Sequence, residues 1–237
     1  MKIILLVLSL MLASVVRMSA ALPERDPAHI SIYVSPFYDA NGPKVNIGPF
    51  SVGLASSDEN KFLSTIGQMK RAWRELNFVE LYVGAMRLYD LGYRKESVYW
   101  FYSAQYRGRQ FSMLLDDAKR GGIGDVGYDL FYAQDAFYSL AGPYINGYAF
   151  GDTDALIETV ARVQKEGRSI PDLQAIYPSV GFKPKAGWGT ANAQLADNMD
   201  KLITILKDQK EDFKQQRAEA GTDVEFSKLA SKELPDG

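Results

Sequence analysis

The chain has 237 residues, no cysteine, a single histidine and a formal charge of −2. These features exclude a disulfide-stapled fold and a zinc site built from several nitrogen and sulfur ligands. The weak acidity gives no general attraction for nucleic acid or anionic lipid. Aromatic residues are abundant, with 14 Tyr, 12 Phe and 3 Trp. Tyrosine is the aromatic residue that tolerates partial exposure to solvent. The composition therefore leans toward a binding surface.

Residues 1–21 have the pattern of a removable signal peptide. Lys2 provides the positive start, the run from Ile3 to Val16 is apolar apart from two serines, and Ser19 and Ala21 are small residues at the spacing that a signal peptidase recognises. The run is shorter than the about 20 residues that cross a bilayer. We therefore expect a periplasmic or secreted protein, with no membrane insertion after cleavage. Removal of Lys2 and Arg17 would leave a charge of 25 − 29 = −4.

Residues 29–54 are predicted to form a small, irregular β-hairpin. The stretch 29–34 carries alternating and β-branched residues and stops at Ser35-Pro36, because proline is excluded from strand interiors. Residues 37–43 contain turn-forming Asp, Asn, Gly and Pro, and residues 45–54 return to a strand-like composition. The hairpin would open a single domain that extends over residues 22–220.

From residue 57 to residue 218, apolar residues recur at intervals of three and four, which is the period of amphipathic helices. Ser57-Asp58 is suited to cap a helix start, and Gly92 is suited to end a helix. The last residues, 221–237, are polar and are expected to be a flexible tail. The fold class is therefore mainly α, an irregular helical bundle. The expected helices span residues 57–76, 78–91, 94–120, 126–140, 152–167 and 191–218.

The segment Phe78–Gln110 resembles a single tetratricopeptide-like repeat, in which small residues let two antiparallel helices nest and bulky residues fill the seam. The dipeptide Trp100-Phe101 is similar to the related Sel1-like repeat. The proline that ends the family's repeat is absent, with Arg109 near its place, and no second copy follows. The resemblance implies a helical hairpin and protein binding. The matching small, large, small, small, aromatic and alanine positions are Ala85, Leu88, Gly92, Ser97, Phe101 and Ala104.

Three patterns similar to known ligand sites are better explained without a ligand. The segment Gly122–Gly127 fits the dinucleotide pattern G-x-G-x-x-G, but that pattern functions between a strand and a helix, and here it follows a helical segment. The segment Asp152–Asp154 begins like a calcium loop, but apolar residues occupy the later glycine and acid positions, so helix capping is favoured. His29, at the edge of the first predicted strand, lacks the serine motif that a catalytic triad would require. We therefore expect no cofactor and no metal.

Carboxylates are the remaining side chains that could act as catalytic groups. Five aspartates lie close together in the sequence with tyrosines 128, 132 and 138 between or beside them. Two carboxylates between aromatic walls would suit a glycan-acting enzyme, whereas helix caps and solvated helix faces explain the same residues without catalysis. The distance between the carboxylates would decide between these two explanations, and the sequence does not supply that distance. The five are Asp116, Asp117, Asp125, Asp129 and Asp135.

The aromatic run Tyr99–Tyr102 is the most informative feature of the sequence. At 100° per residue, four consecutive side chains sweep about 300° around a helix, so they cannot all enter one seam. The other rings either meet further helices in the core or remain partly exposed as a partner-binding surface. Tyrosine and arginine are the residues most often found in binding hot spots. The candidate residues of this surface are Arg87, Tyr89, Tyr99, Trp100, Tyr102, Tyr106, Arg107 and Arg109.

Two functions follow from these patterns. The first is an exported, non-catalytic module that binds another protein, and an immunity protein that occludes a toxin is one concrete form of it. The alternative is a cell-envelope enzyme or carbohydrate binder that acts on glycan through carboxylates and aromatic platforms. Neither function involves nucleic acid. Because one fold hosts many functions, the site must decide between them.

Overall fold

The computed structural model of the protein describes residues 27–30 and 47–235. Within these ranges the chain is mainly helical and contains no strand, only an isolated bridge between Leu115 and Phe182. The predicted α class is confirmed. The helices are η2 (Gly48–Phe50), α2 (Ser51–Leu54), α3 (Glu59–Arg71), α4 (Phe78–Asp90), α5 (Arg94–Leu114), η3 (Asp117–Lys119), α6 (Val126–Ala149), α7 (Thr153–Gly167), α8 (Leu173–Ile176), η4 (Lys185–Gly187), α9 (Trp188–Asp208), α10 (Lys210–Glu219) and α11 (Thr222–Phe226).

Helices α4 and α5 form an antiparallel hairpin at the centre of the molecule. The turn is closed by Gly92 at φ +90°, a left-handed conformation that glycine adopts without strain. The two helices approach so closely that a Cβ atom on Gly84 would lie 2.6 Å from the ring of Trp100. Ser97 Oγ donates to the carbonyl of Ala85 across the seam at 2.7 Å. The predicted helical hairpin is therefore present, and its small residues are the ones that permit close packing.

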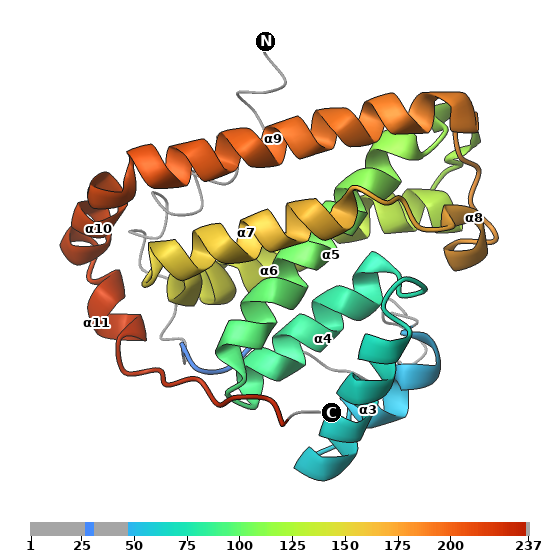
Figure 1. The fold of residues 1–237 in the computed structure, drawn as a ribbon. Helices are drawn as coiled ribbons and strands as arrows, with labels where there is room; N and C mark the ends of the chain where they lie inside the picture. The colour runs from blue at the N-terminus through green and yellow to red at the C-terminus, as the bar shows by residue number, and fades with distance from the viewer. Residues whose placement is uncertain (1–26, 31–46, 236–237) are drawn as a thin grey trace.

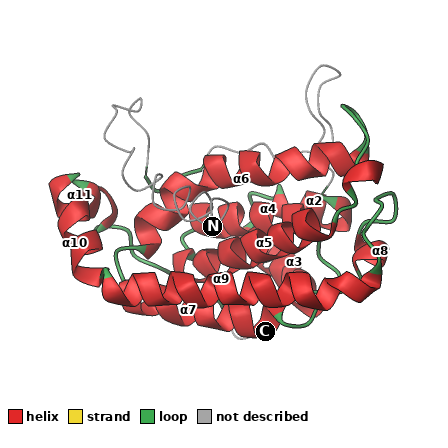
Figure 2. Ribbon diagram, turned by 90° about the horizontal axis from the view of Figure 1, so that it is seen from above, coloured by secondary structure: helices red, strands yellow, loops and turns green. Residues whose placement is uncertain are grey.

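The hairpin is covered on several sides by other helices. Helix α5 packs against α4, α6, α7 and α9, and α7 packs in turn against α9. Figure 1 shows α9 extending along the molecule above α7, and Figure 2 shows α4 and α5 between α6 on one side and α7 on the other. Helix α6 lies on the outside of the bundle, where α4 and α5 cover its inner side. This difference in coverage decides which aromatic residues are buried.

Residues 47–54 do not form the second strand of the predicted hairpin. They form η2 and α2 instead, with Ile47 and Leu54 buried at a helical spacing. Gly53 packs so tightly on α3 that a Cβ atom there would lie 1.9 Å from Thr65 Oγ1. Tertiary packing has therefore overridden the strand-like composition of this stretch. The first predicted strand and the turn fall mainly in residues 31–46, which lie outside the described residues.

Several helix bounds differ from the predictions: α3 ends at Arg71 rather than at residue 76, and the predicted helix 191–218 is divided into α9 and α10. Helix α5 stops at Leu114 rather than at residue 120, because the next residues pair with a distant segment: Lys183 N donates to Leu114 O at 2.8 Å. Helix α6 continues through Pro143 to Ala149, beyond the predicted end at residue 140. The proline removes one hydrogen bond, to the carbonyl of Ser139. Ser139 is exposed, so water can satisfy that carbonyl.

The C-terminal residues are not the flexible tail that was predicted, because they dock on the α4–α5 turn. Helix α11 buries Phe226, whose ring lies where a Cβ atom on Gly147 would be, at 2.4 Å. Further along, Lys232 N donates to Gly92 O at 2.8 Å. Arg94 also donates to the carbonyl of Ala230. A polar composition did not reveal these contacts because each depends on residues far away in the sequence.

No helix in the described part of the chain is both long and apolar enough to cross a membrane. The segment expected to be a signal peptide, residues 1–21, lies outside the described residues. Export therefore stays a prediction.

Candidate functional site

The rings of the predicted partner-binding surface are buried. The exposed fractions of Tyr89, Tyr99, Trp100, Tyr102 and Tyr106 are between 0% and 7%. Of the two possibilities that the sequence left open for the run 99–102, partial exposure does not hold, because α5 is packed against α4, α6, α7 and α9. Full burial, the other possibility that the sequence left open, holds for these rings.

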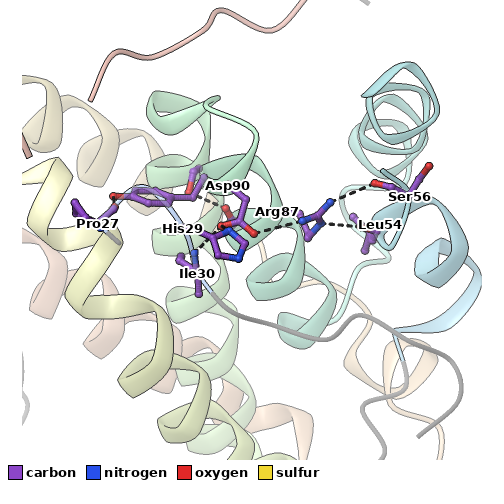
Figure 3. Close-up of polar contacts among 10 residues, drawn as sticks. Pro27, His29, Ile30, Leu54, Ser56, Arg87 and Asp90 are labelled. Carbon is purple, nitrogen blue, oxygen red and sulfur yellow. Dashed lines mark hydrogen bonds and ion pairs between the residues drawn. The ribbon is translucent and has the colours of Figure 1, made fainter. Parts of the chain in front are cut away.

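Arg87 and Tyr89 tie two segments to the end of α4 (Figure 3). Arg87 donates to the carbonyls of Leu54 at 2.9 Å and Ser56 at 3.2 Å, and it pairs with Asp90 at 3.3 Å. Tyr89 Oη donates to the carbonyl of Pro27 at 2.7 Å. These contacts are intramolecular, so the two residues have a structural role in the part of the chain that the structure describes.

Asp90 is the centre of the same cluster. Its carboxylate accepts from Ile30 N at 2.6 Å and lies 3.1 Å from His29 Nδ1 (Figure 3). Burial raises the pKa of Asp90, while the hydrogen bond from Ile30 and the charges of His29 and Arg87 act in the opposite direction. Within residues 27–30 and 47–235, the single histidine therefore contacts one carboxylate and no serine nucleophile. The arrangement holds residues 27–30 against α4.

Trp100, Tyr102 and Arg109 are also used inside the bundle. Trp100 Nε1 donates to Glu96 at 3.0 Å, and Tyr102 Oη donates to Asn146 Oδ1 of α6 at 3.1 Å. Arg109 is half-buried beside Gln134, whose amide oxygen, in the orientation that satisfies both of its polar groups, accepts from Arg109 Nε at 3.2 Å. Trp100 and Tyr102 therefore present no free binding group, and Arg109 uses one of its donors inside the bundle.

Two of the predicted residues, Tyr106 and Arg107, do meet in a cleft. The cleft has a volume of about 350 Å³ and lies between the turn after α3, the middle of α5 and the end of α7. Trp73, Arg74 and Glu166 also line it. We call it the Arg74–Arg107 cleft. It is the place where the sequence-predicted tyrosines and arginines come together.

Trp73, which lines this cleft, is held by a second ring behind it. Trp73 stacks on Tyr99 with ring centroids 5.3 Å apart and planes 12° from parallel. The guanidinium of Arg162 lies 3.7 Å from the centroid of the Tyr99 ring. Glu166 is engaged on the same side, since it accepts from Tyr99 Oη and pairs with Arg162 at 3.0 Å. The only carboxylate among the residues lining the cleft is thus already paired.

The positive charge of Arg107 is not balanced by an ion pair with a described carboxylate. Its Nη1 donates to the carbonyls of Trp73 and Leu76, and it makes no ion pair with a carboxylate among the described residues. Burial lowers the pKa of Arg107, and the like charge of Arg74 lowers it further. Glu80 acts in the opposite direction but is held in the capping box of α4. A guanidinium in this state favours an anion beside it.

A larger cleft, of about 850 Å³, lies between α7, α10 and α11. Its basic residues have acidic neighbours: Lys210 pairs with Asp154 at 2.6 Å, and Arg217 pairs with Asp223 at 2.8 Å. Lys95 and Arg162 of its lining are paired as well, whereas Lys214 makes no ion pair among the described residues. Most of the positive charge in this cleft is therefore balanced within the protein.

The five aspartates considered for glycan chemistry are used locally. Asp125 accepts from Gly122 N at 2.8 Å, and Asp129 accepts from Gly124 N at 3.2 Å. Asp116 and Asp117 pair with bases three residues later. Asp135 is exposed. None of the five lines either cleft described above, so these aspartates form no carboxylate pair in those two clefts.

The other ligand-like patterns have the structural roles that the sequence favoured. The segment Gly122–Gly127 follows η3, not a strand, and forms the loop and first turn of α6. Asp152 caps α7 by accepting from Ala155 N at 3.1 Å. No cluster of metal-ligating side chains occurs among the described residues.

A surface that the sequence analysis missed lies on the outer side of α6. Four of the six large apolar side chains that are exposed among the described residues fall within residues 123–140. We call them the α6 outer face. A signal for it was present in the sequence, since residues 121–161 contain no lysine, arginine or histidine. The four are Ile123 at 90% exposed, Val126 at 49%, Tyr132 at 49% and Leu140 at 40%.

The charges around the α6 outer face are acidic. Asp125, Asp129 and Asp135 are exposed on the same helix or at its start. Arg120, just before this stretch, is already engaged, because it lies 4.8 Å from the Phe131 ring centroid and 3.6 Å from Asp117. The surface therefore combines apolar side chains with negative charge that no described base neutralises in an ion pair.

Comparison with known proteins found a distant relative. A segment of 184 residues is 23% identical to an uncharacterised protein of Haemophilus influenzae, and it covers 76% of this chain and 68% of that protein. No known protein family and no solved structure matches the chain. The function must therefore be argued from the surface and the clefts.

Proposed function

We propose that this protein is an exported, non-catalytic module that binds another protein through the α6 outer face. The observation that carries the proposal is the concentration of exposed apolar side chains at residues 123–140. Contiguous exposed apolar surface rimmed by polar groups is typical of protein–protein interfaces. Export rests on the signal-peptide pattern of residues 1–21.

The aromatic arrangement on α6 supports the same function. Tyr128 and Tyr132 lie with ring centroids 4.7 Å apart, and Phe131 packs edge-on against Tyr132 at 5.3 Å. These neighbours restrain Tyr132 while leaving about half of it exposed. A restrained, exposed tyrosine loses little side-chain entropy on binding, which is why tyrosine is frequent at hot spots.

The charge of the surface indicates the chemistry of the partner. Exposed aspartates and the absence of basic residues from 121 to 161 favour a partner face that is basic and apolar. The same charge disfavours an anionic membrane surface. A toxin with a basic face, occluded by this protein as by an immunity protein, is one form that the proposal takes.

The test uses a fluorescent amphipathic peptide of leucine and lysine, with a leucine–glutamate peptide of the same pattern as its charge control. The proposal predicts saturable, salt-sensitive binding of the basic peptide, weakened by Tyr132→Ser and by Leu140→Ser. The controls are Val52→Ser and Val224→Ser, which remove apolar side chains elsewhere that are more exposed, at 60% and 72% against 49% and 40%.

Three results would overturn the proposal. One is equal binding of the acidic peptide. Another is an equal loss of binding in the α6 variants and in the controls. The third is binding of the protein to anionic lipid vesicles in preference to the basic peptide.

A further inference from the structure

The Arg74–Arg107 cleft has features of a small-molecule site that are independent of the α6 outer face. Its volume of about 350 Å³ lies in the range of about 300–1,000 Å³ typical of ligand pockets. Two guanidinium groups line it, from Arg74 and Arg107. The influence of Arg74 on the pKa of Arg107 indicates that their charges are close enough to repel.

The donors of these two arginines are only partly used. Arg107 places Nη1 on the carbonyls of Trp73 and Leu76, and no other donor of Arg107 contacts an oxygen in the described residues. Arg74 Nη2 donates to Ser169 Oγ at 3.0 Å, which is a neutral acceptor. Glu166, the acid of the cleft, is bound by Tyr99 and Arg162. Two positive charges in one cleft therefore remain available to an anion.

The remaining lining is flat or apolar. Trp73 is half-buried, and Tyr106, Val163 and Pro171 are buried beneath the cleft. A bare inorganic anion would use the arginines but leave this lining unused. A ligand with both a carboxylate and a flat apolar body would use both parts.

We infer that the Arg74–Arg107 cleft binds a small organic carboxylate, with the anion held between the two guanidinium groups and the apolar body against Trp73 and Tyr106. Guanidinium groups match the planar, two-oxygen geometry of a carboxylate. The carboxylate belongs either to a free small molecule or to the chain end of a protein, since both present the same group.

Isothermal titration of the full-length protein with benzoate tests this inference. Benzamide has the same shape without the charge, inorganic phosphate has the charge without the ring, and N-acetylphenylalanine presents the carboxylate as a chain end does. We expect benzoate or N-acetylphenylalanine to bind saturably and more tightly than both benzamide and phosphate, and the tighter of the two identifies the source of the carboxylate.

The variants assign the binding to the cleft. Arg74 is exposed, so Arg74→Gln should fold normally and weaken binding by about tenfold or more. Arg71→Gln is the matched control, because Arg71 is an exposed arginine one turn earlier that does not line the cleft. Arg107→Lys keeps the charge but loses the planar fork, and it should also weaken binding.

Several results would overturn the inference. They are the absence of saturable binding by both carboxylates, binding of phosphate or benzamide as tight as theirs, and equal losses in Arg74→Gln and Arg71→Gln. An unchanged carboxylate affinity in both Arg74→Gln and Arg107→Lys would also overturn it, because neither arginine would then hold the anion.

Discussion

The α4–α5 hairpin and helix α6 are both rich in aromatic residues, yet they use them in opposite ways. In the hairpin, Trp100, Tyr102 and Tyr106 are all less than 5% exposed, whereas Tyr132 of α6 is about half exposed. The difference arises because α5 is packed against α4, α6, α7 and α9, while among the described residues the helices that pack most extensively on α6, α4 and α5, lie on its inner side. A dense run of rings therefore indicates a binding surface only where too few neighbouring helices cover it.

Replacing one ring from each region should give the largest contrast. Trp100→Ala empties a fully buried site and should lower the free energy of unfolding by about 3–5 kcal/mol. Tyr132→Ala, at an exposed position, should cost less than about 1 kcal/mol. Urea unfolding measures both. Equal losses would contradict the difference in burial on which the comparison rests.

Gly147→Ala should have the next largest effect, because it tests how the C-terminal residues dock on α6. The added methyl group would meet the ring of Phe226 at 2.4 Å, and overpacking of this kind costs about 1–3 kcal/mol. Hydrogen exchange should speed up for residues 222–232, which α11 and the contact with Gly92 now protect.

The control for this variant is Gly189→Ala, in the first turn of α9, where a Cβ atom meets nothing within 4 Å. Unchanged exchange at residues 222–232 in Gly147→Ala would show that Phe226 does not hold this segment.

A pair of hydroxyl deletions sharpens the comparison inside the core. Tyr102→Phe leaves the amide oxygen of Asn146 without its donor and should cost about 1–2 kcal/mol. Tyr82→Phe removes a buried hydroxyl that has no hydrogen-bond partner among the described residues, so it should change stability by less than about 0.5 kcal/mol or increase it. Thermal or urea unfolding of both variants measures these two changes in stability. A larger loss in Tyr82→Phe would mean that its hydroxyl has a partner.

The smallest effect concerns the pH dependence of stability through Glu80. Burial raises the pKa of Glu80 above its ordinary value of 4.5, despite the hydrogen bond from Asn77 N and the charge of Arg107. Its contribution to stability is therefore complete below pH 4.5 and decreases as the pH rises through the raised pKa.

Glu80→Gln keeps the capping box, because glutamine also accepts from the cap backbone. Its stability relative to the wild type should increase between pH 4.5 and neutrality. A difference that stays constant with pH, measured by urea unfolding in a series of buffers, would contradict the raised pKa.

Local patterns predicted much of the fold. The start of α7 at Thr153, the cap at Asp58 and the turn at Gly92 are where the sequence indicates them, since caps and left-handed turns depend on neighbouring residues. The helical form of residues 47–54 and the docking of Phe226 were not predicted, because both depend on packing against distant residues.

The candidate site was predicted only in part, for the same reason. The sequence singled out Tyr106 and Arg107, but not Arg74, which joins them from the turn after α3. The absence of basic residues from 121 to 161 was visible in the sequence. This segment could be interpreted as a binding surface only once α6 was known to lie on the outside of the bundle. The periodicity of apolar residues does not predict the position of a helix in the bundle.

The most direct test of the difference between the two regions is hydroxyl-radical footprinting of the folded protein, read by mass spectrometry for each tyrosine. Comparing tyrosines with one another removes differences in intrinsic reactivity. The account predicts that Tyr132 is oxidised much faster than Tyr99, Tyr102 and Tyr106, and that all four become equally reactive after unfolding. Rapid oxidation of the three hairpin tyrosines in the folded state, with Tyr132 protected, would contradict it.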